Sequence, residues 1–467
     1  MTGLLLTTLA THGLLVLTGL GLMQLVCRHK CIMVWACVPF AWGLGCGVVH
    51  LVAKVLLNST WAENWHGSTT AACLAITILG IYFYWKAEER DTSQLDIVES
   101  RMSWLHVVLI LLIVGKILLV ASIAMVYPVF DSDATTPHSY TSLSKYIILG
   151  DLDAMETKPD NFSVSYHVPL LNAWLGGFWD RWHDSLAALS WFFYYFFIIY
   201  GVLVVCLLFN RRLITALIGA YLFSTVPLVI HHVVRPGFHD LPTAYFFMCG
   251  VAAVLFYFFD CKKDWPRATA PLLLFASVIL MPGVKLEGAV WAMWLVFVAG
   301  SFYVLQRQWI GWGKLVLVQL LFIAVVYLVY ILSADFVLQN VQLSSRLEYL
   351  FEIKPFDFNV FSVFINTVFY DSSFRVWWWL TMALAVGLVL TRKDVFTSLA
   401  GVYVLVLLLA VFYHSNFTGN VKYTLINTNV PRFFIQLHTL FLLVYVLFAR
   451  HLEGVFDRKS EQTRHGT

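Results

Sequence analysis

The sequence predicts an all-α integral membrane protein with about thirteen transmembrane helices. Composition and a series of long apolar segments support this prediction. Of the 467 residues, 60% are hydrophobic and only 12% are charged, and the mean hydropathy is +0.78. These values lie well outside the range of soluble globular proteins. The net charge is only +3, and no basic run interleaved with aromatic residues indicates nucleic-acid binding.

Apolar segments long enough to cross a bilayer, about 20 residues each, occur along the whole chain. The first has no basic stretch before it and is followed by further spans, so we interpret it as a helix rather than a signal peptide. The eight cysteines lie in these spans or beside basic loops, which predicts no disulfide framework. The predicted spans are residues 3–26, 32–56, 70–86, 104–127, 185–209, 213–231, 241–259, 269–284, 289–306, 315–333, 374–391, 395–413 and 432–449.

Lysine and arginine are distributed between the loops in a way that predicts the orientation. Alternate loops and the C-terminal tail hold the basic clusters, at residues 28–30, 86–101, 211–212, 262–267, 307–314, 392–393 and 450–464. The positive-inside rule places these clusters in the cytoplasm, so the N-terminus is outside and the C-terminus inside. Every long loop then lies at the outer face of the cytoplasmic membrane: 128–184, 232–240, 334–373 and 414–431.

The first long outer loop begins with two aspartates, Asp131 and Asp133, directly after a predicted span. Paired carboxylates at the end of a span are costly unless they do chemistry or bind an ion. The alternative is that they only cap or solvate the helix end. The same loop holds His167 and an aromatic stretch at 174–179. This stretch predicts interfacial helices with Trp at the depth of the lipid headgroups.

The second outer loop is short and polar. It contains Arg235 and His239 and ends in Asp240, which is followed by Leu-Pro at the start of a span. A carboxylate and a proline are both favourable at a helix N-terminus, so Asp240 is either a functional carboxylate or only an N-cap. The histidines of the outer loops lack HxxxH or HExxH spacing, so the sequence indicates no metal site, although it does not exclude a divalent metal.

Three more charged positions stand out against apolar sequence. The turn at 282–288 contains Lys285 and Glu287, and Arg432 begins the last span, where a guanidinium suits phosphate binding. Isolated cations at helix ends more often serve as interfacial anchors. Lys116 lies near the middle of the fourth span and requires a partner, a water-filled cavity or a lipid phosphate.

In their order along the chain, these features resemble the integral-membrane glycosyltransferases of the GT-C superfamily. A span leads to a long outer loop that opens with acidic residues, then come two spans, a loop ending in Asp-Leu-Pro-Thr-Ala-Tyr-Phe-Phe, and a Lys-x-Glu-Gly turn. The resemblance covers about residues 104–333. It is closest to the bacterial branch that includes the lipid A aminoarabinose transferase and the protein O-mannosyltransferases. Here the acidic pair is split as Asp-Ser-Asp and three spans precede the module, both of which depart from the family pattern.

The resemblance implies a polyprenyl-phosphate monosaccharide as donor, and a glycan, lipid or protein acceptor whose hydroxyl attacks the anomeric carbon with inversion. Such a reaction needs a general base and cations that hold the phosphate, and no cofactor. Either residue of the acidic pair suits the base, with Asp131 preferred because it is nearer the helix end. The implied assignments are catalytic Asp131, Asp133 and Asp240; donor phosphate-binding Lys285, Arg432 and Arg235; and substrate-binding Glu287, His167, His239 and Tyr349.

These features divide the chain into three regions. Residues 1–103 form an N-terminal extension of three spans with a cytoplasmic linker, and residues 104–333 form the catalytic module. Residues 334–467 comprise an outer loop, three spans and a cytoplasmic tail. The outer loop 334–373, which contains Tyr349, is long enough to close over an active site.

Two other functions stay open at this point. An O-antigen polymerase or ligase that uses polyprenyl-diphosphate glycans also has about a dozen spans and large outer loops, but should tolerate replacement of Asp131 and Asp133. A polytopic lipid or sugar transporter should show an internal repeat and broken helices with polar residues near the midplane. The sequence shows no such repeat.

Overall fold

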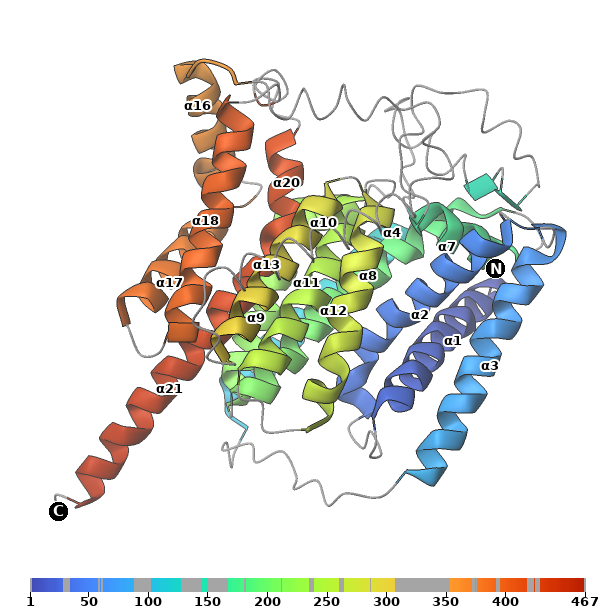
Figure 1. Ribbon diagram of the computed structural model, residues 1–467, viewed down its shortest axis with the longest axis horizontal. Coiled ribbons are helices and arrows are strands. Elements are labelled where there is room, and N and C mark those ends of the chain that lie inside the picture. Colours follow the sequence, from blue (N-terminus) through green and yellow to red (C-terminus); the bar gives the residue numbers. More distant parts are fainter. Residues whose placement is uncertain are drawn as a thin grey trace.

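A computed structural model of the chain shows a bundle of long helices (Figure 1). No β-strand occurs among the residues that the structure describes. Those residues are 2–27, 34–57, 59, 62–87, 102–126, 144–145, 147–148, 167–179, 182–210, 212–234, 239–259, 264–285, 287–306, 353–371, 374, 376–391, 395–417, 424 and 429–465.

The elements up to residue 306 fall into an N-terminal group and a central group. The N-terminal elements are α1 (Thr2–Val26), α2 (Val34–Leu57), the 3₁₀-helix η1 (Ala62–Asn64), α3 (Trp65–Lys86) and α4 (Trp104–Val126). The central elements are α7 (His167–Gly176), α8 (Asp184–Phe209), α9 (Leu213–Ser224), α10 (Pro227–Val234), α11 (Asp240–Phe258), α12 (Asp264–Val284) and α13 (Gly288–Gln306).

The C-terminal elements stand at the side of the bundle opposite α3 (Figure 1). They are α16 (Phe358–Ile365), the π-helical turn η2 (Asn366–Tyr370), α17 (Trp377–Thr391), α18 (Val395–Phe417), α20 (Asn429–Leu437), the 3₁₀-helix η3 (His438–Leu440) and α21 (Phe441–His465). Part of the predicted outer loop 334–373 is therefore helical and packs on α18 through aromatic side chains, among them Phe364 against Phe412.

The structure confirms a helical, multi-pass membrane protein but not the predicted count of thirteen spans. Ten helices among the described residues are long and apolar enough to cross a membrane, or eleven if a bent pair counts as one span. The predicted span 315–333 lies outside the described residues. The predicted span 374–391 corresponds to α17, which has 15 residues and is about 22 Å long, shorter than a typical hydrocarbon core.

The bent pair is α9 and α10, which the sequence predicts as one straight span, 213–231. The two helices meet at 59° across the break between Ser224 and Pro227. Proline lacks a backbone N–H and clashes with the preceding turn, so Pro227 begins a new helix rather than continuing α9. The apolar pattern alone gave no sign of this break.

The helix α11 lies at the centre of the bundle. It is the most buried of the membrane-spanning helices among the described residues, and it packs against α8, α10, α12, α13, α20 and α21. Its side chains are apolar on all sides, as expected for a helix surrounded by others. The first residue of this helix, Asp240, is the charged exception.

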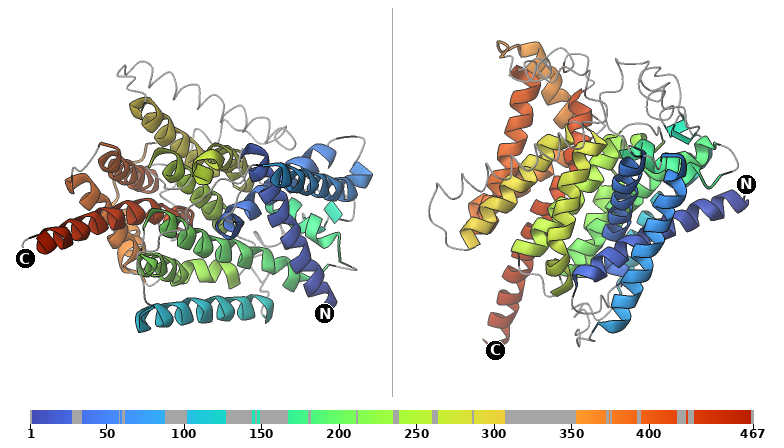
Figure 2. Two further views of the ribbon diagram at one scale, coloured as in Figure 1. Left: turned by 90° about the horizontal axis from the view of Figure 1, so that it is seen from below. Right: turned by 45° about the vertical axis from the view of Figure 1, so that its right-hand side comes forward.

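The segments that the sequence assigns to the outer face gather at one end of the bundle. The beginnings of α11 and α20, the end of α12 and the helix α7 all lie at the upper end in Figure 1, while α21 leaves the opposite end (Figures 1 and 2). The helix α7 falls in the loop where we expected interfacial helices, but all ten of its residues are buried, against α2, α8 and α12. Trp174 is fully buried and its indole N–H donates a hydrogen bond to the hydroxyl of Thr70. The depth of this helix relative to the lipid headgroups stays a prediction.

Two glycine contacts hold α1 against α2. A Cβ on Gly19 would overlap the backbone of Ala41, and a Cβ on Gly45 would overlap the carbonyl group of Leu15. Small residues allow helix backbones to approach closely in membranes, where van der Waals packing is a main source of association. Because α2 contributes to the core around α7, α8 and α12, this contact connects the N-terminal spans to the rest of the bundle.

The first prediction compares two glycines of α1. Gly19→Ala should lower the free energy of unfolding by about 1–3 kcal/mol, because the new methyl group has no room against α2. Gly13→Ala, where nothing lies within 4 Å of the added methyl, should leave stability unchanged or raise it by up to about 1 kcal/mol. Denaturation of the two purified variants in the same detergent measures the difference, and equal stability would contradict the close contact.

Candidate functional site

The candidate site is built around the carboxylate of Asp240, which is completely buried at the start of α11. His239 occupies the N-cap position and Asp240 the first helical position, so Asp240 is not the simple N-cap that the sequence left open. Its side chain contacts other segments of the chain. A carboxylate in the first turn is also favoured by the partial positive charge of the helix N-terminus.

Three side chains donate to this carboxylate. Lys285 Nζ lies 2.6 Å from Oδ1, and Arg432 Nε lies 3.0 Å from Oδ2. Gln436 Nε2 donates to Oδ1 over 2.6 Å, and its own Oε1 accepts from the indole N–H of Trp291. We call Asp240, Lys285, Arg432 and Gln436 the Asp240 cluster. It joins three segments that are far apart in sequence: α11, the turn after α12, and α20.

Local structure explains how each cation reaches the carboxylate. The backbone N–H of Lys285 bonds to the carbonyl of Met281, so the chain leaves α12 with the lysine turned toward α11. Gly288 follows because a Cβ there would overlap the same Met281 carbonyl. On α20, Arg432 and Gln436 are four residues apart and therefore project from the same face of the helix.

The Asp240 cluster has an excess of positive charge. One fully buried carboxylate faces two cations, with the lysine side chain 11% exposed and the arginine side chain 30% exposed. Glu287 Oε1 lies 3.7 Å from the lysine but is 38% exposed, so solvent weakens its contribution. A buried charge requires partners of opposite sign, and the two cations together compensate the desolvation of Asp240. What remains is about one positive charge at the end of the bundle.

Histidines lie around this cluster. His232 Nδ1 is 4.0 Å from Asp240 Oδ2, which is too far for a hydrogen bond. His239 bonds through Nδ1 to the carbonyl of Val284 at 2.8 Å, so Nδ1 carries the proton there.

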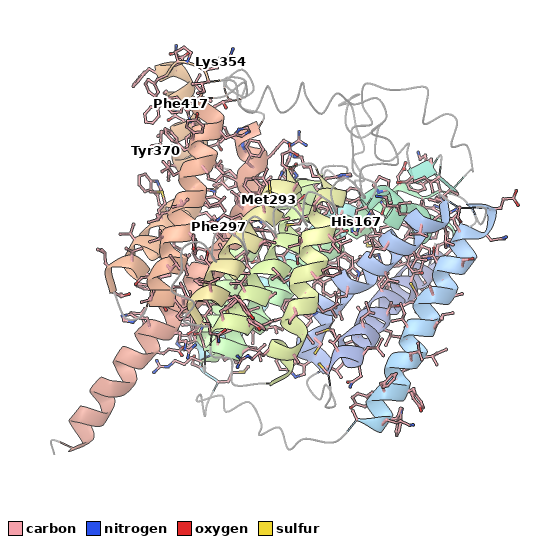
Figure 3. All side chains as sticks on the ribbon, in the orientation of Figure 1. His167, Met293, Phe297, Lys354, Tyr370 and Phe417 are labelled. Carbon is pink, nitrogen blue, oxygen red and sulfur yellow. The ribbon has the colours of Figure 1, made fainter. Side chains whose placement is uncertain are left out.

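A second layer contains His50 and His167, whose ring centroids are 5.2 Å apart. His167 Nε2 is 3.1 Å from the hydroxyl of Tyr194, and the side chain lies at the same end of the bundle as the cluster (Figure 3). Burial, together with the neighbouring His50 and His239, holds the pKa of His167 well below its usual value. The imidazole is therefore neutral at physiological pH. No group of three His, Cys, Asp or Glu in the described part of the chain is arranged to hold a metal ion.

The structure thus brings together three of the sequence-predicted residues, Asp240, Lys285 and Arg432, with Glu287 and His239 beside them. His167 lies one layer away. The remaining candidates are outside the described residues: Asp131, Asp133, Arg235 and Tyr349. Sequence reasoning missed Gln436, although its spacing of four from Arg432 on one helix was a usable signal, and it missed His50, an isolated histidine in an apolar span.

The fold and this site define a class: a multi-pass helical membrane protein with a buried, charged cluster at one end of its bundle. Comparison with known proteins goes no further, because no family model, no curated protein and no solved structure matches the chain.

The second prediction tests the charge balance of the cluster. Asp240→Asn should lower the free energy of unfolding by about 3–5 kcal/mol, because it leaves the buried Lys285 and the partly buried Arg432 without their carboxylate. Glu287→Gln removes a more exposed carboxylate near the same lysine and should cost less than about 1 kcal/mol. Thermal unfolding in detergent compares the two variants. An Asp240→Asn protein as stable as the Glu287→Gln protein would show that the cluster does not stabilise the fold.

The third prediction concerns pH. An unfolded histidine gains a proton near pH 6.5, whereas buried His167 stays neutral to lower pH, so the unfolded state binds more protons and stability falls as pH drops below about 6.5. His167→Gln should reduce this loss by up to about 1.4 kcal/mol per pH unit. Tyr194→Phe, which removes the hydrogen-bond partner but no titrating group in this range, should keep the wild-type slope. Unfolding measured from pH 7 to pH 5 gives the three slopes, and identical slopes for all three proteins would refute the assignment.

Proposed function

We propose that this chain is an inverting glycosyltransferase that moves a monosaccharide from a polyprenyl-phosphate donor to an acceptor at the outer face of the cytoplasmic membrane. The observation that best supports this is the Asp240 cluster, with two cations on one buried carboxylate at the end of a membrane bundle. A polyprenyl phosphate has one anionic group at the end of a long apolar chain. It therefore needs cations at this depth and apolar helix surfaces below them.

Lys285 and Arg432 are the residues that would hold the donor phosphate. In the transfer reaction the bond between the anomeric carbon and the phosphate oxygen breaks, and negative charge develops on the leaving phosphate. Preorganised cations stabilise such charge best when they do not have to reorient. The carboxylate of Asp240 and the amide of Gln436 supply that preorganisation. Arg235 stays a reserve candidate for the same phosphate.

Asp240 suits a positioning role better than proton abstraction. Its two oxygens already accept from Lys285, Arg432 and Gln436, so neither is directed at an acceptor hydroxyl. The general base is then Asp131 or Asp133, with Asp131 preferred because it follows the span more closely. The base takes the proton of the acceptor hydroxyl, whose oxygen forms the new bond to the anomeric carbon on the face opposite the departing phosphate.

The remaining candidates would bind the uncharged part of the substrates. Glu287 and His239 border the cluster, His167 lies one layer away, and Tyr349 is in the predicted outer loop 334–373. A neutral imidazole can hydrogen-bond to sugar hydroxyls without the cost of burying a charged group. Lys285 and Arg432 would together neutralise the charge of the donor phosphate, so we assign no metal to the reaction. We also propose that residues 104–333 form a catalytic module arranged as in the GT-C superfamily.

One observation favours a second candidate, a lipid or sugar transporter. Broken transmembrane helices often form substrate sites in transporters, and α9 and α10 are a span broken by 59°. The end of α10 also brings His232 to within 4.0 Å of Asp240. A transporter would carry the lipid-linked sugar across the membrane intact. A transferase would cleave it and release the polyprenyl phosphate.

The fourth prediction tests the proposed reaction. Purified protein in vesicles is given a radiolabelled polyprenyl-phosphate sugar and envelope acceptors, and transfer of the label is measured. Asp131→Asn or Asp133→Asn should lower kcat by about 10²–10⁴-fold, since one of the two carboxylates is the general base. Lys285→Met should mainly weaken donor binding and raise KM.

Glu156→Gln, in the same predicted outer loop but without an assigned role, is the matched control and should keep wild-type transfer. Full activity in both aspartate variants would exclude the acidic pair as the base. Transport of intact donor with no transfer by the wild-type protein would instead favour the second candidate.

A further inference from the structure

The helix α4 lies at the margin of the bundle, with one side covered by α8, α9 and α10 (Figure 2, left). Its opposite side is apolar and open. Large side chains along that side are strongly exposed, namely Leu111, Leu112, Val114, Leu118 and Leu119. Beside them, no atom of the described residues lies within 4 Å of the position that a Cβ on Gly115 would take. A helix of another molecule could therefore approach the backbone closely at this point.

Lys116 lies on this helix at mid-depth and is only partly buried. It is the thirteenth of the 23 residues of α4, so it is about 15 Å from the nearer end of the helix. Among the described residues, no hydrogen bond, ion pair or aromatic contact involves its ammonium group. A lysine near a span end reaches the headgroups with its flexible stem, but from the middle of a span the stem is too short to do so.

The predicted spans contain no carboxylate that could pair with Lys116 at this depth. None of the chain's 27 Asp and Glu residues lies within any of the thirteen predicted spans. The carboxylates of the described spans lie where the spans begin or end, as Asp184, Asp240 and Glu453 do. A second copy of the same chain packed on α4 would therefore bring apolar side chains to Lys116 and no counter-charge.

We propose that the open face of α4 is the docking surface for a transmembrane helix of another protein, one that carries an aspartate or glutamate at mid-depth. An ionisable residue inside a membrane is costly and pairs with a group of opposite sign where one is available. Charge complementarity at Lys116 sets the register of the two helices, and Gly115 gives the space for close packing. This proposal is independent of the catalytic one.

The test uses a defined probe. Two synthetic leucine-rich helices of about 23 residues, one with Glu and one with Gln at the central position, carry a fluorophore and are added to the full-length protein in phosphatidylcholine vesicles. Energy transfer to a labelled protein reports binding. The wild-type protein should bind the Glu helix on the order of tenfold more tightly than the Gln helix.

Three variants make the result specific. Lys116→Met should abolish the preference for the Glu helix and Lys116→Arg should keep it. Leu119→Met, at an exposed position three residues along and on the same side of α4 as Lys116, should leave it unchanged. Equal binding of the Glu and Gln helices to wild-type protein, or no binding of either, would overturn the proposal. So would an outcome in which Lys116→Met changes only the retention of phosphatidylglycerol in mixed vesicles, because that result assigns the lysine to lipid phosphate.

Discussion

The buried carboxylate of Asp240 is the constraint on which the upper end of this bundle depends. Removing a carboxylate from water is strongly unfavourable, and the cost is offset here only because Lys285 and Arg432 both reach it from other segments. The start of α11, the turn after α12 and the start of α20 must therefore come together for the central helix to be buried. The geometry of the candidate site is a consequence of this requirement, whatever ligand occupies it.

Much of the fold follows from the sequence, because apolar segments of bilayer length have few alternatives to a membrane helix. The positions of the charged site residues were also predictable, since Asp240, Lys285 and Arg432 interrupt apolar sequence at span ends. Their mutual contact was not, because hydropathy carries no information on which span ends meet. The bend before Pro227 was missed for a related reason: the window averages over a proline that its apolar neighbours outweigh.

The contacts also change how each carboxylate is understood. From sequence, Asp240 and the acidic pair at 131–133 looked alike, each a carboxylate where a span meets the membrane surface. In the structure Asp240 accepts from three side chains and is committed to holding cations in place. A residue so occupied contributes to catalysis by orienting others, which is why the proposed reaction assigns the proton transfer to the first outer loop.

Asp240 and Lys116 show two ways in which this chain carries charge among apolar helices. Asp240 is paired within the chain, and the pairing is possible because its partners lie at other span ends on the same level. Lys116 lies at mid-depth, where the chain places no carboxylate in any predicted span. The described residues therefore give this lysine no counter-charge, and a second copy of the predicted spans would bring none either. A cation at the margin of an open helix face, with no partner among the described residues, is better explained by an external partner than by the fold.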